Sequence, residues 1–388
     1  MIKIDLIIPS LISYQKYPEF QNFRRFLKFQ EIPFPSWSGN WFPIWLNLRN
    51  LKKMDVDVRF LNYKNIEKKR IANIVGVDSR IINNLIFKYG YVSKTLKKEI
   101  IPLLKKLRKK VEYLFYFDNS DSTGHFHSEV FPYVDRYFKK QMLKDREIYK
   151  KNLYGKRLFS DFYARNYNLN KKNESKEGFE LVLKYQNKIA LSWNFAFKDY
   201  RYSTLLTRFL YGLTRKNNIT FYPPNRNRKI ILAANFSVKP SYKLIYFQRN
   251  QLLRLLKEKF NSNPKFCIGK IPKKEYLKTM RTSKTIISPY GWGEICYRDF
   301  ETFIAGGALI KPDMDHLDTW PNFYKKDRTY LSLPWKLELW NDTITKILSD
   351  EDNLLDIARE GQKSYKKIWT LKGNLAFCEH FIKMMTFD

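Results

Sequence analysis

The stretch TIISPYGWGEICYRDFETFIAGGALIKPDMDHLDTWPNFY, residues 285–324, carries the signals that decide the fold. It divides into an apolar run (285–288), a loop with Gly291 and Gly293, a segment of helical spacing (295–305), a glycine break at Gly306 and Gly307, and a second apolar run (308–311). Short apolar runs bounded by glycines predict buried strands, and a glycine pair after a helical pattern predicts its end. The stretch therefore predicts a strand, a loop, a helix and a strand.

This order of elements also predicts a site for a phosphorylated ligand. The first N–H groups of a helix have no partner within the helix, and the helix dipole favours negative charge at the same end. Glycines in the preceding loop let the backbone approach an anion closely. We therefore expect the loop Gly291-Trp292-Gly293 to bind the ligand, with Glu301 on the helix that follows.

The run Glu301–Ile310, ETFIAGGALI, resembles the donor-site helix of nucleotide-sugar glycosyltransferases with the GT-B fold, of the group 1 type with two acidic residues on that helix. The resemblance implies that Glu301 contacts the ribose of the nucleotide and that Glu294 lies near the transferred sugar. The family pattern has seven residues between the two glutamates, whereas six separate them here. Arg298, three residues before Glu301, is also similar to the arginine of exostosin-like members.

The resemblance implies an α/β fold with two Rossmann-like domains that face each other across a cleft. We expect an N-terminal acceptor-binding domain over residues 1–222 and a C-terminal nucleotide-sugar domain over 229–369. A C-terminal helix within 370–388 is expected to cross back to the first domain.

The rest of the chain agrees with alternating strands and helices. Strands or short apolar runs are expected at 4–8, 56–61, 82–87, 112–117, 229–234 and 265–269, and helices at 96–110, 248–260, 273–282 and 374–385. This alternation predicts parallel sheets covered by helices. The Pro- and Asn-rich segment between 223 and 229 predicts a linker.

A polar loop, DNSDSTGHFH at 118–127, follows the apolar run at 113–117. Ligands of open α/β sheets bind beyond the carboxyl ends of the strands, so this loop is a candidate for catalysis. Asp121 or His125 could remove the proton from an acceptor hydroxyl. The alternative interpretation is a cluster of turn and cap residues, since Asp, Asn and Ser stabilise turns in any protein. We expect no metal site at His125 and His127, because no third ligand is evident and GT-B enzymes generally work without one.

Cationic side chains are expected to stabilise the departing diphosphate. Arg298 in the first turn of the predicted helix and Lys311 at the end of the next strand are candidates, together with Lys243 and Arg249 near the first strand-to-helix connection of the second domain. In a chain this basic, each of these cations can equally well be an ordinary surface charge.

The chain has 72 Lys and Arg against 38 Asp and Glu, a net charge of +34 over 388 residues. Residues 291–360 hold 14 acidic and 8 basic side chains, a net of −6, so the rest of the chain carries the basic excess. The runs 97–110 and 136–157 hold seven and nine basic residues. This charge favours an anionic membrane surface or acceptor. A solvated charge coat and nucleic acid are the alternatives.

No apolar run is long enough for a transmembrane helix, and the N-terminal residues predict a strand rather than a signal peptide. Three cysteines at wide spacing form neither a disulfide framework nor a zinc pattern. We expect a cytoplasmic protein, peripheral at the inner face of a membrane.

We therefore expect a metal-independent glycosyltransferase that moves a sugar from a nucleotide diphosphate sugar to a glycan or lipid-linked saccharide in cell-surface polysaccharide synthesis. The two glutamates favour retention of configuration, and their altered spacing leaves inversion open. The alternatives are a nucleic-acid-binding protein and a GT-B homologue without catalysis.

Overall fold

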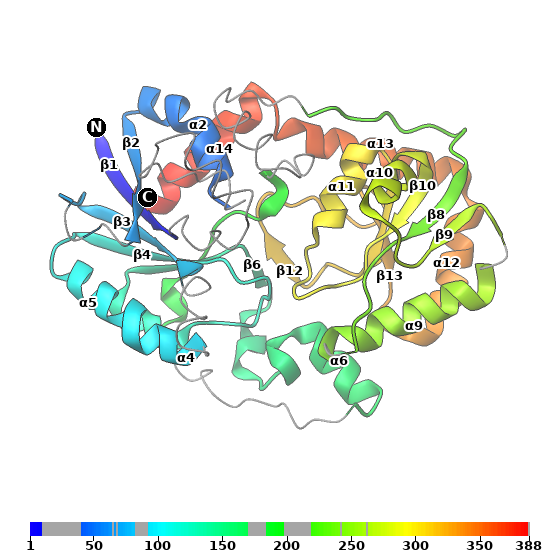
Figure 1. Cartoon of the computed structure of the whole chain (residues 1–388), viewed down its shortest axis with the longest axis horizontal. Helices are drawn as coiled ribbons and strands as arrows, with labels where there is room; N and C mark the ends of the chain where they lie inside the picture. The colour runs from blue at the N-terminus through cyan, green and yellow to red at the C-terminus, as the bar shows by residue number, and fades with distance from the viewer. Residues whose placement is uncertain are drawn as a thin grey trace, which may run out of the picture.

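The structure, a computed structural model, describes residues 1–9, 40–63, 66, 69–81, 92–169, 184–197, 219–240, 243–260 and 263–386. The apolar run expected at 82–87 lies outside these residues. Within them, two sheets form two lobes that lie side by side (Figure 1).

The sheet of the first lobe has six strands in the order β2-β1-β3-β4-β5-β7, and every neighbouring pair is parallel. The strands are β1 (Ile2–Ile8), β2 (Val56–Asn62), β3 (Ile74–Asp78), β4 (Tyr113–Asp118), β5 (Arg136–Lys139) and β7 (Ile189–Leu191). The expected strands at 4–8, 56–61 and 112–117 are confirmed as β1, β2 and β4. No sequence pattern predicts β3, which is only five residues long and has a glycine at its centre.

The second lobe has five strands in the order β13-β11-β10-β8-β9, again with every neighbouring pair parallel. They are β8 (Ile230–Ala234), β9 (Phe266–Ile268), β10 (Ser283–Ile287), β11 (Ala308–Pro312) and β13 (Leu331–Leu333). Side chains alternate between the two faces: Ile286 packs with Met280 and Ala305, whereas Ile287 packs with Leu252 and Trp340. The sheet is therefore covered by helices on both faces.

The helices of the first lobe are α2 (Phe42–Lys53) and a continuous helical stretch of α4 (Val92–Thr95), a π-helical turn (Leu96–Ile100) and α5 (Ile101–Arg108). The next helix, α6 (Leu158–Asn166), packs against the second lobe, with Phe159 against Tyr290. The helices of the second lobe are α9 (Lys243–Phe260), α10 (Lys273–Thr282), α11 (Tyr297–Ala305), α12 (Trp340–Ser349) and α13 (Glu351–Lys367), and the last helix is α14 (Leu371–Thr386). Short strands β6 (Gln141–Leu143) and β12 (Leu317–Thr319) complete the pattern.

Both sheets are doubly wound, and the expected pair of Rossmann-like sheets is confirmed. In each sheet the strand order reverses next to the first strand, between β1 and β3 in the first lobe and between β8 and β10 in the second. Such switch points open a crevice at the carboxyl edge of the sheet, where ligands of this fold class bind. The loops after β8 and β10 are therefore candidates for a ligand-binding site.

The helix α11 shows why the central stretch folds as predicted. The side chain of Asp299 accepts a hydrogen bond from the backbone N–H of Cys296 at 3.0 Å and so caps the start of the helix. At the other end Gly306 has a φ of 72°, a left-handed conformation that glycine adopts without strain. The cap explains why the helix begins at Tyr297, two residues after the expected start.

The two lobes are joined by more than the linker. Strand β6 of the first lobe pairs antiparallel with β12 of the second, and α14 lies beside α2 on the first lobe (Figure 1). Phe377 of α14 packs edge-on against Trp193, with ring centroids 5.3 Å apart. The C-terminal helix therefore crosses back to the first lobe, as expected. Each fully buried aromatic of this kind stabilises the fold by about 1.5–3 kcal/mol relative to exposure.

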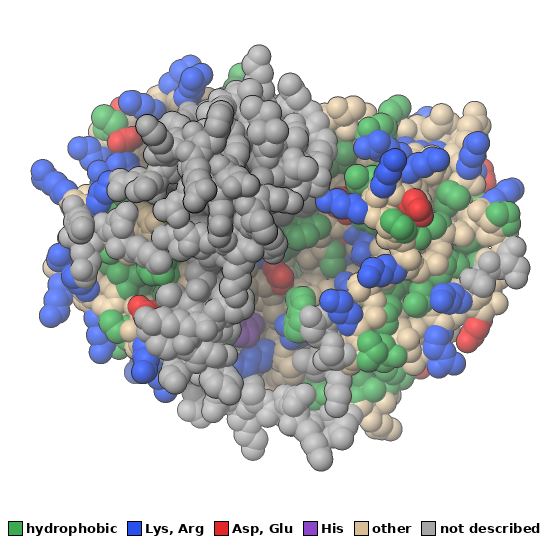
Figure 2. All heavy atoms as spheres, in the orientation of Figure 1, with side chains coloured by type: hydrophobic (Ala, Val, Ile, Leu, Met, Phe, Trp, Pro, Cys, Tyr) green, Lys and Arg blue, Asp and Glu red, His purple; other side chains and the backbone are tan. Residues whose placement is uncertain are grey.

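Figure 2 shows one face of the molecule, on which Lys and Arg side chains are spread over both lobes and outnumber Asp and Glu. The visible part of this face has no single basic stripe of the kind that follows a nucleic-acid backbone. Within the described residues, no helix combines the length and the apolar character that crossing a membrane requires.

Candidate functional site

The loop 288–296 after β10 meets the loop 118–127 after β4, so the carboxyl edges of the two sheets come together. The two loops meet directly at Gly293, where a Cβ atom would lie 1.6 Å from the carbonyl oxygen of Asp121. Only glycine fits here, for reasons of space. Two loops that the sequence singled out separately therefore form one site between the lobes.

Glu294 crosses this contact. Its side chain is fully buried and accepts hydrogen bonds from Thr123 Oγ1 at 2.7 Å and from Gln141 Nε2 at 2.9 Å, both from the first lobe. Burial raises the pKa of Glu294, and the hydrogen bond from Thr123 opposes that shift. The buried carboxyl group thus connects the two lobes and is not exposed to solvent.

Asp121 is the more accessible carboxylate. Its side chain is 48% exposed, while its partner Lys140 is 2% exposed with Nζ 2.9 Å from Asp121 Oδ1. Burial lowers the pKa of Lys140 and the charge of Asp121 opposes this. The ammonium also lies 3.8 Å from the centre of the Phe195 ring. The buried Lys140 therefore holds one oxygen of Asp121 from the protein interior, while the carboxylate stays half exposed to solvent.

His125 and His127 pack together, with ring centroids 5.3 Å apart. Burial lowers the pKa of His125 to about 3 and also lowers that of His127. Nδ1 of His127 lies 2.9 Å from the hydroxyl of Tyr116, whereas the buried Nδ1 of His125 has no hydrogen-bond partner. The carboxylate of Asp121 is half exposed and can be reached by an acceptor hydroxyl, so its accessibility favours Asp121 over His125 as the group that accepts a proton.

A buried ion pair supports the 118–127 loop. Lys139 Nζ lies 2.9 Å from Asp118 Oδ2 and donates to the carbonyl of His125 at 2.6 Å, and the Tyr137 hydroxyl donates to the same carboxylate at 2.8 Å. Burial alone would raise the pKa of Asp118, but the charges of Lys139 and the two histidines hold it well below its usual range. The ion pair therefore ties the loop to β4 and β5.

Two arginines of the second lobe lie on the helices that follow β8 and β10, the two strands of the switch point. Arg249 of α9 donates from Nε to the carbonyl of Tyr290 at 2.7 Å and from Nη1 to that of Ser237 at 2.9 Å. Burial lowers the pKa of Arg249, the neighbouring Cys296 opposes this shift, and the charge of Arg298 lowers the pKa further. The Arg298 guanidinium lies 5.8 Å from the Phe236 ring, and its buried Nε has no hydrogen-bond partner.

Glu301 lies on α11, one turn beyond Arg298. The hydroxyl of Tyr276 donates to Glu301 Oε2 at 2.6 Å. Burial raises the pKa of Tyr276, and the charge of Glu301 raises it further, so the hydroxyl stays protonated and the hydrogen bond holds the carboxylate in place. The two residues come from α10 and α11, which lie on the same face of the sheet.

Lys311 has a different environment from the one expected. It is fully buried, with Nζ 3.1 Å from Asp299 Oδ2 and 3.3 Å from the carbonyl of Ser288. The Asp299 carboxylate also accepts from the hydroxyls of Ser288 and Tyr324, at 2.6 and 2.7 Å. Lys311 therefore links β11 to α11 and presents no exposed charge to a phosphate. Lys243 begins α9, and its side chain lies outside the described residues.

Buried polar atoms without a partner gather around the β8–β10 switch point. Besides Nε of Arg298 they include Oδ1 of Asn235, which follows β8, and Nε2 of Gln248, whose Oε1 accepts from the backbone N–H of Tyr290 at 3.2 Å. Folded proteins leave few such groups unsatisfied, and each one calls for a water or a ligand. These atoms thus mark where a polar ligand would bind.

Trp292 and Arg157 form the outer contact of the site. Arg157, from the first lobe, donates from Nε to the carbonyl of Trp292 at 2.6 Å, and its guanidinium lies 5.4 Å from the centre of the indole. Gly291 is buried, and a Cβ there would lie 3.1 Å from Arg249 Nη2. The glycine therefore lets the loop pass close to that guanidinium.

The sequence reasoning missed several residues of this site: Thr123, Lys140, Gln141, Arg157, Phe195 and Tyr276. Thr123 lies two residues from Asp121 and shares its loop, which is a signal that the sequence did contain. Lys140 and Gln141 lie in the basic run 136–157, whose charge favours an anionic membrane surface or acceptor and gives no sign of these two contacts.

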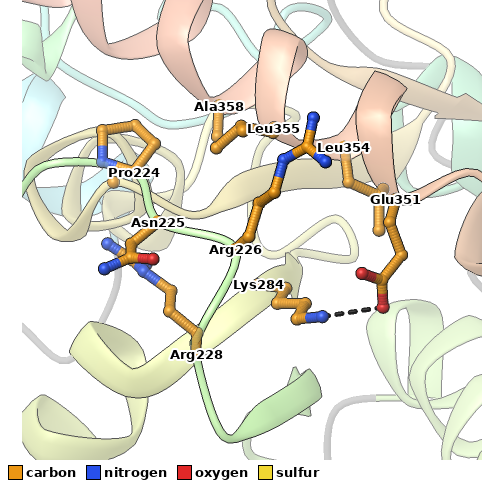
Figure 3. A pocket seen from close by; sticks show the side chains of 10 residues that line it. Pro224, Asn225, Arg226, Arg228, Lys284, Glu351, Leu354, Leu355 and Ala358 are labelled. Carbon is orange, nitrogen blue, oxygen red and sulfur yellow. Dashed lines mark hydrogen bonds and ion pairs between the residues drawn. The ribbon is translucent and has the colours of Figure 1, made fainter.

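A separate pocket lies at the opposite, amino-terminal edge of the second sheet, between the linker and α13 (Figure 3). Its cations are already paired. Lys284 Nζ lies 2.7 Å from Glu351, Arg226 pairs with Asp352, and Arg228 donates to backbone carbonyls. Burial lowers the pKa of Arg228 to about 10. These ion pairs and hydrogen bonds hold the linker against the second lobe.

In the described part of the chain, no group of three or more His, Cys, Asp and Glu side chains is placed to hold a metal ion.

No family model matches the chain, and no curated protein matches it. Solved structures do. The chain is similar to the Anabaena protein HepE in complex with UDP, at 8% identity and a TM-score of 0.44 over 100% of both chains. It is similar to a glycosyltransferase from Rickettsia africae at 11% identity and a TM-score of 0.46, over 99% of this chain and 98% of that one. It is also similar to sucrose-phosphate synthase from Thermosynechococcus elongatus at 10% identity and a TM-score of 0.44, over 99% of each chain. At TM-scores below 0.5 these likenesses carry no argument about what this chain binds.

Proposed function

We propose that this protein is a glycosyltransferase that moves a sugar from a nucleotide diphosphate sugar to an acceptor bound between the lobes. One observation carries the proposal: Arg298 lies in the first turn of α11, beside the switch point of the second sheet, and its buried Nε has no hydrogen-bond partner among the described residues. The charge of Arg298 also lowers the pKa of Arg249, so an anion bound between them would be stabilised by both guanidinium groups. A diphosphate supplies that anion.

The second lobe offers groups for each part of the donor. Arg298, in the first turn of α11, would hold the diphosphate, with Arg249 behind the glycine loop. Glu301, held by Tyr276, would accept hydrogen bonds from the ribose hydroxyls. The same cations would stabilise the charge that develops on the departing diphosphate.

Asp121 faces this site from the first lobe. We assign it the role of the group that takes the proton from the acceptor hydroxyl, since its carboxylate is half exposed and is oriented by Lys140. Glu294 positions the loop that carries Asp121, through Thr123 and Gln141. Asp121 acting as a base would serve an inverting transfer. Retention stays a prediction from the two-glutamate resemblance.

The acceptor is proposed to be a glycan or a lipid-linked saccharide of cell-surface polysaccharide synthesis, reached at the inner face of a membrane. The basic excess outside residues 291–360 supports this, because each Lys or Arg near an anionic surface contributes about 1 kcal/mol to binding. Co-sedimentation with vesicles of anionic lipid should be strong at low salt and weak at high salt. No binding at low salt would remove the membrane from the proposal.

A thermal-shift panel of UDP, GDP, CDP, ADP, dTDP and CMP tests the function. A ligand that binds only the native state raises its stability by RT ln(1 + [L]/Kd), or about 2.7 kcal/mol at 100 times Kd. We expect one nucleoside diphosphate to raise the melting temperature of the wild-type protein clearly more than the others. A cooperatively melting protein that responds to none of them would overturn the proposed function.

A further inference from the structure

Asn235 follows directly after β8, and only one end of its side-chain amide has a partner. The residue is 6% exposed. Nδ2 donates to the carbonyl of Gly269 at 2.9 Å and lies 3.3 Å from that of Cys267, at the end of β9. Oδ1 is buried and has no hydrogen-bond partner among the described residues. Exchanging the two amide atoms would place Oδ1 against the Gly269 carbonyl oxygen, so these contacts decide which atom is left unpartnered.

A buried asparagine of the first lobe shows the ordinary arrangement. Asn194, which is 1% exposed, donates from Nδ2 to Thr319 Oγ1 at 3.0 Å and accepts at Oδ1 from the backbone N–H of Ala196 at 2.9 Å. Folded proteins satisfy nearly all buried acceptors in this way. Oδ1 of Asn235 therefore calls for an N–H or O–H group that a ligand or a water would supply.

The residues after Asn235 contact both arginines that the proposed function assigns to the diphosphate. The ring of Phe236 has its centre 5.8 Å from Arg298 Cζ. The carbonyl of Ser237 accepts from Arg249 Nη1 at 2.9 Å. Asn235 thus lies beside the proposed phosphate site, on the side towards β9.

The carboxyl ends of β10, β8 and β9 carry these groups in an order that fits a nucleotide. Arg298 lies on the helix after β10, Asn235 follows β8 and Gly269 follows β9, and these strands are neighbours in the sheet in that order (Figure 1). Adjacent strands are about 4.8 Å apart, so β9 lies about 10 Å from β10. A diphosphate at Arg298 would therefore leave its base over the ends of β8 and β9.

The backbone at Gly269 leaves room for a flat ring next to Asn235. Its φ is 106°, a conformation that residues with a side chain rarely adopt. A Cβ atom there would meet no described atom within 4 Å. The surface beside the unpartnered oxygen is therefore open.

We propose that Asn235 determines which nucleotide binds, because its Oδ1 accepts a hydrogen bond from an N–H group of the nucleobase. This rests on the proposed function, which includes a nucleotide donor but no particular base. The ribose hydroxyls are the other donors of a nucleotide, and the proposed function assigns them to Glu301. Uracil and guanine carry a ring N–H, whereas cytosine and adenine carry an amino group, so the experiment distinguishes these sources.

The first experiment uses the full wild-type chain and nucleotides that are methylated on the base. Isothermal titration measures the affinities of UDP, GDP, CDP and ADP beside those of 3-methyl-UDP, 1-methyl-GDP, N4,N4-dimethyl-CDP and N6,N6-dimethyl-ADP. The preferred nucleotide is expected to lose at least tenfold in affinity on methylation, because a site built to accept an N–H rejects a ligand that lacks it. Pyrophosphate, which has no base, is the reference for the phosphate site. These titrations require no variant and so do not depend on how a substitution affects folding.

The second experiment removes the acceptor. Asn235→Ala should bind the preferred nucleotide and its methylated analogue within about twofold of each other, and should bind pyrophosphate as the wild type does. Asn194→Ala is the matched control, since it also removes a buried asparagine whose Nδ2 donates across the fold. Both variants are expected to melt at a lower temperature than the wild type, but only Asn235→Ala should lose the discrimination.

Two outcomes would overturn this inference and leave the proposed function in place. One is a wild-type protein that binds a nucleoside diphosphate but tolerates methylation of its base, as expected if a water satisfies Oδ1. The other is an Asn235→Ala variant that still discriminates tenfold. A wild-type protein that binds no nucleoside diphosphate would overturn the proposed function, and this inference with it.

Discussion

Glu294 of the second lobe accepts a hydrogen bond of 2.7 Å from Thr123 of the first, inside a contact from which both side chains are excluded from solvent. The pair joins the two sheets at their carboxyl edges. A buried carboxylate that loses its donor keeps the cost of desolvation without the compensating bond. The relationship therefore couples the geometry of the site to the stability of the interlobe contact.

Thr123→Val removes that hydroxyl at nearly constant volume. We expect the free energy of unfolding to fall by about 1–3 kcal/mol, since the Glu294 carboxyl is left with an unsatisfied oxygen. Urea unfolding at pH 7 measures the change. Thr123→Ser keeps the hydroxyl and should lose less than half as much. Equal stability of the valine variant and the wild type would contradict the assigned hydrogen bond.

Glu301→Ala should weaken binding of the stabilising nucleotide by about ten- to a hundredfold, as expected for a lost charged hydrogen-bond acceptor. Tyr276→Phe keeps the glutamate but removes the hydroxyl that orients it, so a smaller loss is expected. Isothermal titration with the diphosphate and with the matching 2′-deoxy diphosphate makes the test specific, because only the wild type should discriminate between them. An alanine variant that still discriminates would remove Glu301 from the ribose site.

Arg298→Ala should weaken nucleoside diphosphate binding by about ten- to a hundredfold and leave binding of the free nucleoside within about twofold. The reason is that a guanidinium binds the phosphates through charge-assisted hydrogen bonds. Arg254→Ala, at a 64% exposed position on α9, removes the same charge away from the site and serves as the control. Equal losses in both variants would mean that net charge, and not position, governs the affinity.

Asp121→Asn should slow sugar transfer by about 10²- to 10⁴-fold, the usual contribution of a general base, with nucleotide binding retained. The substitution also leaves the buried ammonium of Lys140 without its charged partner, so the folded fraction must be checked by circular dichroism at the assay temperature. His125→Gln should reduce the rate far less. The reverse ranking would transfer the role of base to His125.

Stability should fall as the solution is acidified below neutral pH. Burial lowers the pKa values of His125 to about 3 and of His316 to about 4, so between these values and about 6.5 the unfolded chain binds protons that the native protein does not. The contribution is complete above about pH 6.5 and is lost as the pH falls, at up to about 1.4 kcal/mol per pH unit for each histidine. Thermal unfolding from pH 7 to pH 5 measures it, and His125→Gln should flatten the dependence. A flat profile in the wild type would contradict these shifts.

The second lobe could be predicted from the sequence because its signals are local. Apolar runs mark β8, β10 and β11, and Gly306 ends α11 at the expected residue. The first lobe was harder, since β3 is short and its centre is Gly76, whose missing side chain makes room for Phe117. No pattern within one segment reports such a contact between strands.

The site was predicted only in outline. Asp121, Arg298 and Glu301 stand out by residue type and spacing, whereas the partners that give them their properties come from distant segments. Lys140 and Lys311 show the limit most clearly, because a lysine in a basic sequence gives no sign that the fold will bury it and pair it with a carboxylate. Pairing of this kind depends on tertiary structure and can be seen only there.

A substitution at Gly293 offers a way to measure how closely the two lobes approach each other. A single methyl group at this position would overlap the backbone of Asp121, and backbone atoms cannot rotate out of the way as a side chain can. Gly293→Ala would therefore push the two loops apart where Gly293 meets Asp121, and so increase the distance between the lobes. Small-angle scattering of that variant would give the dimensions of the parted molecule, a reference against which any domain movement during the catalytic cycle can be scaled.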